Sequence, residues 1–393
     1  MNILFLERYW PVFGGGQTVT RILSNAFCER GHKVHVVYFN YNDGGTKVMI
    51  DPRVIEHYLP QFHCNIGSGY DMEDTEHVGD VVCEIINSND IDIVINQFHP
   101  YSFVRPIKEK TNAKVIWCLH MMFLLPYVKP KISDTKRWMK HTLFPSHYKK
   151  KMVPNAIATV NKAMPYIDKF VFLSDIYANE YLYYAGDMYK DKVTAIGNAI
   201  SISAKEADIP KVKEKIVLYV GRISEEMKRI SIILKSWQII SRKWGIDDWR
   251  LVIVGGGDDL ESYKNYVQKH KLQNVYFEGF QNPVSYYARS SLFVMTSSYE
   301  GVPMVVLEAQ MMGVVPIVMD SFPAVHDIIK DGNNGILTPN NNITVFAESV
   351  HNLMEDDTLR NRLKANGEQS CQQFSIDNIV DKWEALFEQL LQE

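Results

Sequence analysis

The stretch that decides the fold is "SLFVMTSSYEGVPMVVLEAQMMGVVPIVMD", residues 291–320. Its two ends, "SLFVMTS" and "VPIVMD", are short apolar runs typical of buried strands. Between them "SYEG" has loop composition and "VPMVVLEAQMMG" that of a helix, in which Pro303 suits the first turn and Gly313 the end. A strand, a helix and a second strand in this order predict two neighbouring parallel strands.

The same alternation of apolar runs and amphipathic helices extends along the whole chain. The runs are NILFL, KVHVVYF, IDIVINQF, KVIWCLH, KFVFLS and KVTAIGN in the first half, and KIVLYVGRI, RLVIVGGG, NVYFEGF, SLFVMTS and VPIVMD in the second. Two intervening stretches have apolar residues at helical spacing: Val19, Ile22, Leu23, Ala26 and Phe27, then Ile230, Ile233, Leu234, Trp237 and Ile240. We therefore expect an α/β protein with two doubly wound, Rossmann-like domains facing a central cleft.

One charged segment interrupts this pattern. Residues 203–215, "SAKEADIPKVKEK", contain seven charged side chains, a proline and no apolar periodicity, which is typical of a linker. A chain of 393 residues is also long for one domain. We expect a first domain at 1–202, the linker at 203–215, a second domain at 216–375, and a helix at 376–393 that packs back toward the first domain.

The composition narrows the class of protein. Hydrophobic residues make up 46% and charged residues 22%, as in ordinary globular proteins, and the net charge of −4 gives no indication of a nucleic-acid partner. Five dispersed cysteines without a CxxC pair predict free, buried thiols in a reducing compartment. "MNILFLERYW" resembles a strand rather than a signal peptide, and "MMFLLPYV" is far shorter than the roughly 20 residues of a membrane span. We expect a cytoplasmic protein, or one on the inner face of the plasma membrane.

Candidate site residues follow the predicted strands, because open parallel sheets bind ligands beyond the carboxyl ends of their strands. Glu300 follows "SLFVMTS", and Glu308 lies in the next helix. The first-turn amides of Met304 and Val305 favour an anion, while carboxylates accept hydrogen bonds from sugar hydroxyls. The alternative is a solvated loop residue followed by a surface helix residue.

Two cations follow the first strand of the second half. Arg222 ends that strand and Lys228 lies six residues further on. Together with a helix N-terminus they would form a diphosphate site without a metal, although either residue alone is equally typical of a solvated surface. "DID" at 90–92 begins a strand and "DD" at 258–259 starts a helix, so neither is expected to bind metal.

The first half offers two weaker candidates. "GGGQTV", residues 14–19, follows a strand and opens a helix, which lets backbone amides approach a phosphate or sugar. It lacks the GxGxxG spacing, and a tight structural turn is an equal alternative. His120 ends "KVIWCLH", where a histidine is often structural.

These residues together carry a resemblance to the retaining glycosyltransferases of family 4, which have the GT-B fold. The matching features are the glycine-rich turn, "RGHKVHVV", the strand-end histidine, "VGRI" with the lysine of "MKR", the E-x7-E pair in "EGVPMVVLEA", the "DGNNGIL" turn and the terminal helix. The resemblance spans the whole chain. It implies that Arg222 and Lys228 hold a donor diphosphate, and that Glu300 with the amides of Met304 and Val305 holds the donor sugar and its β-phosphate.

The resemblance implies further donor contacts. Glu308 would bind the nucleotide ribose, and the backbone near Phe280 would meet the base. His120 would contact the sugar from the other domain, and Gly15 and Gly16 would approach the diphosphate. Arg222, Lys228, Glu300 and His120 are thus the candidate catalytic residues.

Three departures from the family pattern affect other details. "NAIS", residues 198–201, stands where Asn-Gly-hydrophobic-Asp is common; Gln17 replaces an acidic or small residue; and Arg229 stands where glycine often follows the lysine. These departures concern interdomain and acceptor contacts more than donor binding.

The activity this implies is transfer of a hexose-type sugar, with retention and without a metal or cofactor, from a nucleotide sugar such as a UDP-sugar. The acceptor would be a glycan or a lipid-linked glycan in cell-surface polysaccharide or glycolipid synthesis. The alternative is a catalytically silent GT-B subunit that binds a sugar nucleotide or a partner. An NAD enzyme would require GxGxxG and a ribose-binding acid, a pair that neither half contains.

A basic segment suggests a location. Residues 129–151 contain eight Lys or Arg and one acid, a net +7 in a chain of −4. Aromatic and apolar residues interleave with these cations, so residues 136–151 are expected to lie on an anionic membrane surface. The alternative is a solvated basic helix.

Overall fold

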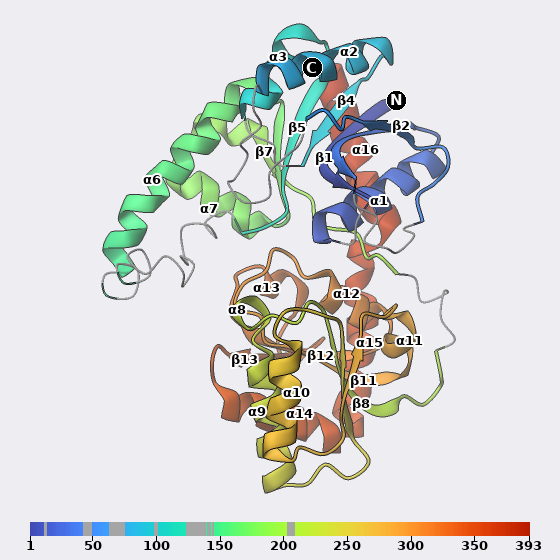
Figure 1. Ribbon diagram of the computed structural model, residues 1–393, viewed down its shortest axis with the longest axis vertical. Coiled ribbons are helices and arrows are strands. Elements are labelled where there is room, and N and C mark those ends of the chain that lie inside the picture. The colour runs from blue at the N-terminus through green and yellow to red at the C-terminus, as the bar shows by residue number, and fades with distance from the viewer. Residues whose placement is uncertain are drawn as a thin grey trace. The chain divides into compact units, whose positions relative to one another are not determined.

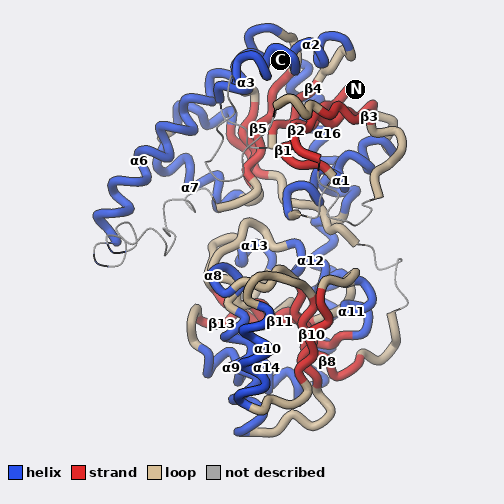
Figure 2. Tube along the Cα trace, viewed as in Figure 1, coloured by secondary structure: helices blue, strands red, loops and turns tan. Residues whose placement is uncertain are grey.

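The computed structural model describes residues 1–11, 14–41, 49–62, 75–97, 101–122, 145–202 and 209–393, together with 139 and 143. These residues form two compact units. Unit 1 comprises Met1–Ala199 with Ile376–Glu393, and unit 2 comprises Ile200–Ser375. In each unit the strands, red in Figure 2, lie among helices.

Unit 1 is built on a parallel sheet with the strand order β3-β2-β1-β4-β5-β6-β7. The strands are β1 (Asn2–Trp10), β2 (Lys33–Tyr41), β3 (Ile55–Tyr58), β4 (Ile93–Asn96), β5 (Lys114–Leu119), β6 (Lys169–Phe172) and β7 (Val193–Ala195). The order reverses between β1 and β4, whose pairing ends at Leu6 and Asn96. Ligands of doubly wound sheets bind at such a switch point.

The helices of unit 1 include one from the far end of the sequence. They are α1 (Gly15–Glu29), α2 (Thr75–Ser88), α3 (Tyr101–Lys110), α6 (Pro145–Ala163), α7 (Asp175–Ala185) and α16 (Ile376–Gln392). Phe387 of α16 packs on Phe27 of α1 with ring centroids 5.5 Å apart, and Arg30 pairs with Asp381 at 2.9 Å. Figure 1 shows α16 in red beside the blue α1.

Unit 2 has a parallel sheet with the order β10-β9-β8-β11-β12-β13. Its strands are β8 (Glu214–Val220), β9 (Arg250–Val254), β10 (Val275–Gly279), β11 (Ser290–Met295), β12 (Val315–Asp320) and β13 (Ile336–Pro339). Its helices are α8 (Glu225–Lys228), α9 (Ile230–Lys243), α10 (Leu260–His270), α11 (Val284–Arg289), α12 (Met304–Met311), α13 (Val325–Ile328), α14 (Ile343–Glu355) and α15 (Asp357–Ser370). The βαβ prediction from residues 291–320 is confirmed, since β11 and β12 pair in parallel. Pro303, however, precedes the helix as its N-cap instead of lying in its first turn.

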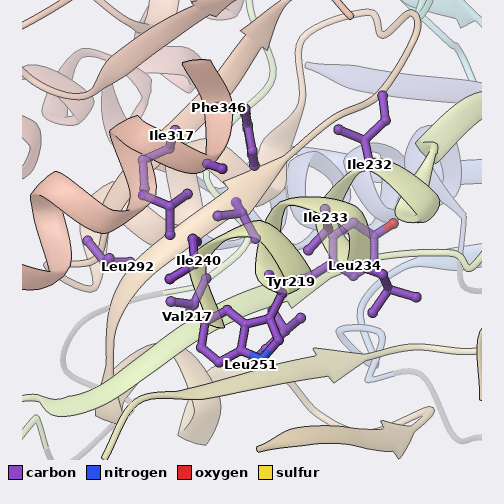
Figure 3. Close-up of a cluster of buried hydrophobic side chains, with 14 of the residues drawn as sticks. Val217, Tyr219, Ile232, Ile233, Leu234, Ile240, Leu251, Leu292, Ile317 and Phe346 are labelled. Atoms are coloured by element: carbon purple, nitrogen blue, oxygen red, sulfur yellow. The ribbon is translucent and has the colours of Figure 1, made fainter. Parts of the chain in front are cut away.

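The core of unit 2 packs α9 and α14 against the sheet (Figure 3). Val217, Leu251, Leu292 and Ile317 come from four different strands, and all are at most 2% exposed. The predicted apolar stripe of α9 is fully buried on them. Burying each large apolar side chain stabilises the unit by about 1.5–3 kcal/mol.

Two predictions about composition can be checked directly. Cys28, Cys83, Cys118 and Cys371 are free and buried, as expected, while Cys64 lies outside the described residues. Among the described residues, no helix combines the length and the apolarity that crossing a membrane requires.

Candidate active site

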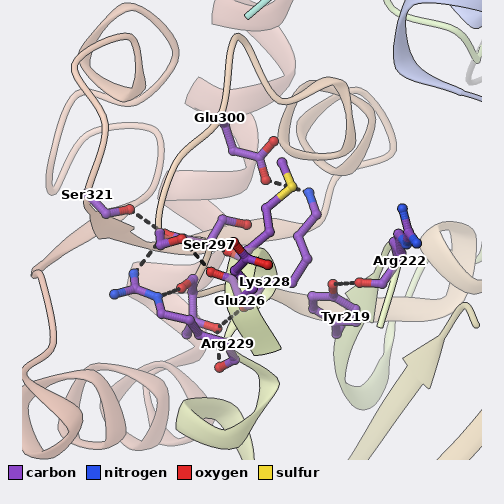
Figure 4. A network of polar contacts seen from close by, with 11 residues as sticks. Tyr219, Arg222, Glu226, Lys228, Arg229, Ser297, Glu300 and Ser321 are labelled. Carbon is purple, nitrogen blue, oxygen red and sulfur yellow. Dashed lines mark hydrogen bonds and ion pairs between the residues drawn. The ribbon is translucent and has the colours of Figure 1, made fainter. Parts of the chain in front are cut away.

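The structure brings two of the candidate catalytic residues of unit 2 into direct contact. Lys228 ends α8, and Glu300 lies in the loop between β11 and α12. Lys228 Nζ is 2.5 Å from Glu300 Oε1, and the two side chains are 16% and 9% exposed (Figure 4). This ion pair is shielded from water and fixes a carboxylate and an ammonium at one point beyond the sheet.

The N-terminus of α12 follows this pair along the chain. Val306 N donates to the Pro303 carbonyl at 3.1 Å, whereas the amides of Met304 and Val305 begin the helix, where no intrahelical acceptor exists. The positive end of the helix dipole therefore lies close in sequence to Glu300, as expected for an anion-binding segment.

Arg229 secures the backbone next to Lys228. Its guanidinium donates to the carbonyls of Thr296 at 2.6 Å and Ser297 at 2.7 Å, beyond the end of β11. It also donates to the side chains of Asn340 and Asn341 at 2.9 and 2.7 Å. The hydroxyl of Thr296 donates in turn to the Lys228 carbonyl at 2.9 Å. Arg229 thus separates α8 from α9 and ties both helices to the end of β11.

Arg222 lies away from this ion pair in Figure 4. Its guanidinium is 73% exposed and 3.8 Å from the exposed Asp258, a weak surface pair. Its carbonyl accepts a hydrogen bond from the Tyr219 hydroxyl at 2.9 Å. Arg222 is therefore positioned by its backbone, while its side chain extends into solvent.

Two glycines that the sequence reasoning missed hold this loop in place. A Cβ at Gly255 or Gly257 would fall on the carbonyl oxygens of Gly221 and Ile223 respectively. Ile223 N donates to the Gly256 carbonyl at 2.9 Å, which joins the loops after β8 and β9. In the sequence, the three glycines at the end of "RLVIVGGG" were the feature from which this close packing could have been predicted.

The acidic pairs make structural contacts. Asp259 precedes α10 but makes no side-chain cap there; its carboxylate accepts from the Glu225 amide that begins α8, at 2.8 Å. Asp92 accepts from the amide of Asn2 at 2.7 Å, joining β1 to the start of β4. The described residues contain no cluster of three or more His, Cys, Asp or Glu able to hold a metal.

Glu308 is buried at 6% exposure, so the surface-helix alternative is wrong. Its carboxylate accepts hydrogen bonds from the hydroxyls of Ser201 and, at 3.1 Å, Tyr287. Burial raises the pKa of Glu308, and the two hydroxyls offset part of that effect. Ser201, the last residue of "NAIS", thus supplies a hydrogen-bond donor to Glu308.

The remaining donor candidate in unit 2 lies at the end of β10. Phe280 follows Gly279, whose φ is +70°, and its side chain is 66% exposed. It is thus placed at the carboxyl edge of the sheet, with a large exposed apolar ring.

In unit 1 the glycine-rich turn opens α1. Gly14 is the N-cap, and its carbonyl accepts from Thr18 N at 2.8 Å. A Cβ at Gly15 or Gly16 would meet no atom within 4 Å, and neither residue has a positive φ. A tight structural turn among the described residues therefore does not explain these two glycines.

His120 lies just beyond β5 and bonds through Nε2 to the Gln97 side-chain oxygen. Burial lowers the pKa of His120 to about 4, an effect that Asn198 partly offsets. The ring is therefore neutral at pH 7. Of the basic segment at 136–151, residues 145–151 form the start of α6, and residues 136–138, 140–142 and 144 lie outside the described residues. Met139 and Leu143 are 54% and 63% exposed.

Two family models match most of the chain. "Glycosyltransferase Family 4" matches residues 13–204, and "Glycosyl transferases group 1" matches residues 202–370. An uncharacterized glycosyltransferase of Haemophilus influenzae is 27% identical over 63% of this chain and 69% of its own length. The capsular polysaccharide biosynthesis glycosyltransferase CapM of Staphylococcus aureus is 25% identical over 52% of this chain and 57% of its own.

The fold has many solved counterparts. The crystal structure of a variant of S. aureus TarM superposes with a TM-score of 0.73 at 16% identity, covering 98% of this chain and 99% of that one. With two parallel-sheet, Rossmann-like domains and both family models matched, the chain belongs to the glycosyltransferases with the GT-B fold.

Proposed function

We propose that the chain is a retaining, metal-independent glycosyltransferase that moves a hexose-type sugar from a nucleotide sugar, preferably a UDP-sugar, to a glycan or lipid-linked acceptor. The pathway would be the synthesis of a cell-surface polysaccharide or glycolipid. CapM, by its name, serves capsule synthesis, and the TarM structure contains UDP and alpha-GlcNAc-glycerol. The observation that carries the proposal is the shielded Lys228–Glu300 pair beside the start of α12.

The chemistry follows from charge. Breaking the bond between the anomeric carbon and the nucleoside diphosphate places extra negative charge on the β-phosphate. An ammonium and the amides of Met304 and Val305 aimed at that phosphate stabilise the transition state more than the ground state. Lys228 has three N–H groups, so it can retain Glu300 and still donate to a phosphate oxygen. Glu300 in turn can accept from sugar hydroxyls.

The other assignments complete the donor site in this proposal. Arg222 supplies a second cation to the diphosphate, and Gly15 and Gly16 leave room for it. Glu308 binds the ribose, Phe280 lies near the base, and His120 contacts the sugar. Glu308 already accepts two hydrogen bonds, which leaves lone pairs free on a carboxylate that can accept about four.

The test is turnover of a panel of nucleotide sugars in excess EDTA, with Lys228→Ala compared with Lys235→Ala. Lys235 is an exposed lysine on α9 and serves as the matched control. We expect Lys228→Ala to lose roughly a hundred- to thousandfold in rate, the usual cost of removing one transition-state donor, in a variant that remains folded by circular dichroism. Its melting temperature should fall, because Glu300 is left as a shielded carboxylate without its cation. Activity that vanishes in EDTA and returns with Mn²⁺ would contradict the metal-independent mechanism, and near-normal turnover by Lys228→Ala would contradict the site.

We further propose that the basic segment at 136–151 attaches the protein to an anionic membrane. Its described residues Met139, Leu143 and Lys150 are exposed. Basic residues interleaved with exposed apolar side chains are typical of a membrane-surface segment.

A further inference from the structure

Four side chains in unit 1 form one continuous chain of hydrogen bonds. His120 Nε2 bonds to the oxygen of the Gln97 amide, and the Gln97 nitrogen donates to Thr20 Oγ1 at 2.9 Å. Thr20 Oγ1 donates to Glu7 Oε1 at 2.5 Å. The four residues come from the ends of β4 and β5, from α1 and from β1, so the fold, not the sequence, joins them.

The chain of bonds has a direction, and Glu7 sets it. A carboxylate only accepts, so the single hydroxyl hydrogen of Thr20 goes to Glu7. The Thr20 oxygen can then only accept, which requires the NH₂ end of the Gln97 amide to face it. The Gln97 oxygen consequently faces His120, and a carbonyl oxygen also only accepts. Nε2 of His120 must therefore carry the ring hydrogen, which leaves Nδ1 with its lone pair.

The reverse arrangement is possible only when Glu7 is neutral. A protonated Glu7 could donate to Thr20, Thr20 to a turned Gln97 amide, and that amide to His120 Nε2, which would move the ring hydrogen to Nδ1. Glu7 is 2% exposed, and burial raises its pKa to about 7. The direction of these hydrogen bonds is therefore best defined above pH 7, where Glu7 is mostly ionised.

Nδ1 is the ring atom that the relay leaves as an acceptor. Among the described residues no hydrogen bond of ordinary geometry reaches this buried atom, although the Asn198 side chain interacts with the ring. His120 and Asn198 are polar members of a small, otherwise mostly apolar cavity of about 10 Å³, enough for one water molecule. A buried acceptor of this kind is costly unless a donor reaches it.

We propose that Glu7, acting through Thr20 and Gln97, is a positioning residue that holds His120 as the Nε2–H tautomer and so makes Nδ1 a hydrogen-bond acceptor for a ligand hydroxyl. The tautomer follows from contacts within unit 1 alone. That the hydroxyl belongs to a donor sugar rests on the proposed function. A buried carboxylate in β1 thus determines which hydrogen bond a histidine beyond β5 can offer.

The direct test is nitrogen NMR of the full chain labelled with ¹⁵N-histidine, without ligand. The two ring nitrogens of a neutral imidazole have distinct shifts, so the tautomer is read directly, and His120→Asn identifies the signal. The spectrum is recorded about one pH unit above the pKa of Glu7, where this carboxyl is mostly ionised. We expect His120 to be almost wholly the Nε2–H form.

Three variants separate positioning from stability. Thr20→Val preserves the shape but breaks the relay, and Glu7→Gln can offer Thr20 either a donor or an acceptor. Both should convert the single tautomer into a mixture. Thr159→Val is the control, since that exposed hydroxyl bonds only to the Asn155 carbonyl of its own helix. A wild-type Nδ1–H form, or an unchanged Nε2–H signal in folded Thr20→Val, would overturn the proposal.

A kinetic measurement adds the ligand. For whichever nucleotide sugar is turned over, Thr20→Val should raise the donor KM about five- to tenfold, the usual effect of losing one neutral hydrogen bond. Thr159→Val should have the wild-type KM. An unchanged KM together with a mixed tautomer would overturn the ligand contact. If no nucleotide sugar is turned over while the Nε2–H form is observed, the proposed function fails and the relay stands.

Discussion

Arg229 occupies a backbone conformation that most side chains avoid. Its φ and ψ are +51° and +47°, the left-handed region, which glycine adopts without strain. The strain is about 1–2 kcal/mol for a residue with a Cβ. The guanidinium contacts to Thr296, Ser297, Asn340 and Asn341 offset it.

Substitutions at Arg229 should follow a specific order of stability. Arg229→Lys keeps the strained backbone but replaces a planar fork with a single ammonium, so it loses about 1.5–3 kcal/mol of charge-assisted hydrogen bonding. Arg229→Gly loses the same bonds but also relieves the strain. We expect urea unfolding to rank wild type above Gly and Gly above Lys. A lysine variant as stable as the glycine variant would show that the strain is negligible.

Gly257 and Gly256 offer a second comparison between neighbours. A Cβ at Gly257 would fall on the Ile223 carbonyl, whereas one at Gly256 would meet nothing within 4 Å. We expect Gly257→Ala to cost about 1–3 kcal/mol of unfolding free energy and to displace the loop that carries Arg222, lowering turnover. Gly256→Ala should behave as wild type in thermal unfolding and in turnover. Equal effects of the two changes would contradict this packing argument.

At the scale of elements, β2 and β3 are joined by a histidine pair, of which His35 is buried and His57 partly buried. His35 Nδ1 and His57 Nε2 are 2.9 Å apart, and the rings stack 5.2 Å apart. Burial, together with the neighbouring His57, lowers the pKa of His35 to about 4 from its usual 6.5. The unfolded chain therefore takes up a proton below pH 6.5 that the folded chain refuses until about pH 4.

The sign of this linkage predicts loss of stability on acidification. Stability should fall as the pH drops from 6.5 toward about 4, by about 3 kcal/mol from His35. His35→Phe keeps a ring at the position but cannot be protonated, so its unfolding free energy should fall less over this range. Urea unfolding measured at a series of pH values provides the check, and His326→Phe, on the exposed surface, is the control. Parallel pH profiles for wild type and His35→Phe would contradict the assignment.

Elements with a strong apolar pattern were predictable from the sequence, and weakly patterned ones were not. The runs beginning at Asn2 and Lys33 became long buried strands because every second residue or more is apolar. β3 and β13 were missed because each has only four residues and lies at a sheet edge, where one side needs no apolar partner. Glu7, Thr20 and Gln97 were missed for another reason: their proximity arises only when β1, α1 and the end of β4 come together in the fold.

At the scale of the whole molecule, charge is unevenly distributed along the chain. The segment 129–151 carries +7, so the remaining residues carry −11. A protein of net −4 that nevertheless binds anionic lipid would do so through this segment and against the charge of its remainder. Salt should therefore weaken the attraction between the basic segment and the anionic lipid, and it should also screen the repulsion between the lipid and the other residues. At low ionic strength the short-range attraction of the basic segment dominates.

The corresponding prediction concerns binding to anionic vesicles. Each basic residue at such a surface contributes about 1 kcal/mol, so changing Lys149, Lys150 and Lys151 together to glutamate should weaken binding at least about a hundredfold. The control changes three exposed lysines of unit 2, Lys235, Lys264 and Lys269, to glutamate, which alters net charge equally. Co-sedimentation at low and high salt measures the result. Binding lost equally in both triple variants would assign the effect to net charge, and a wild type that ignores anionic vesicles at low salt would favour a soluble glycan as the acceptor.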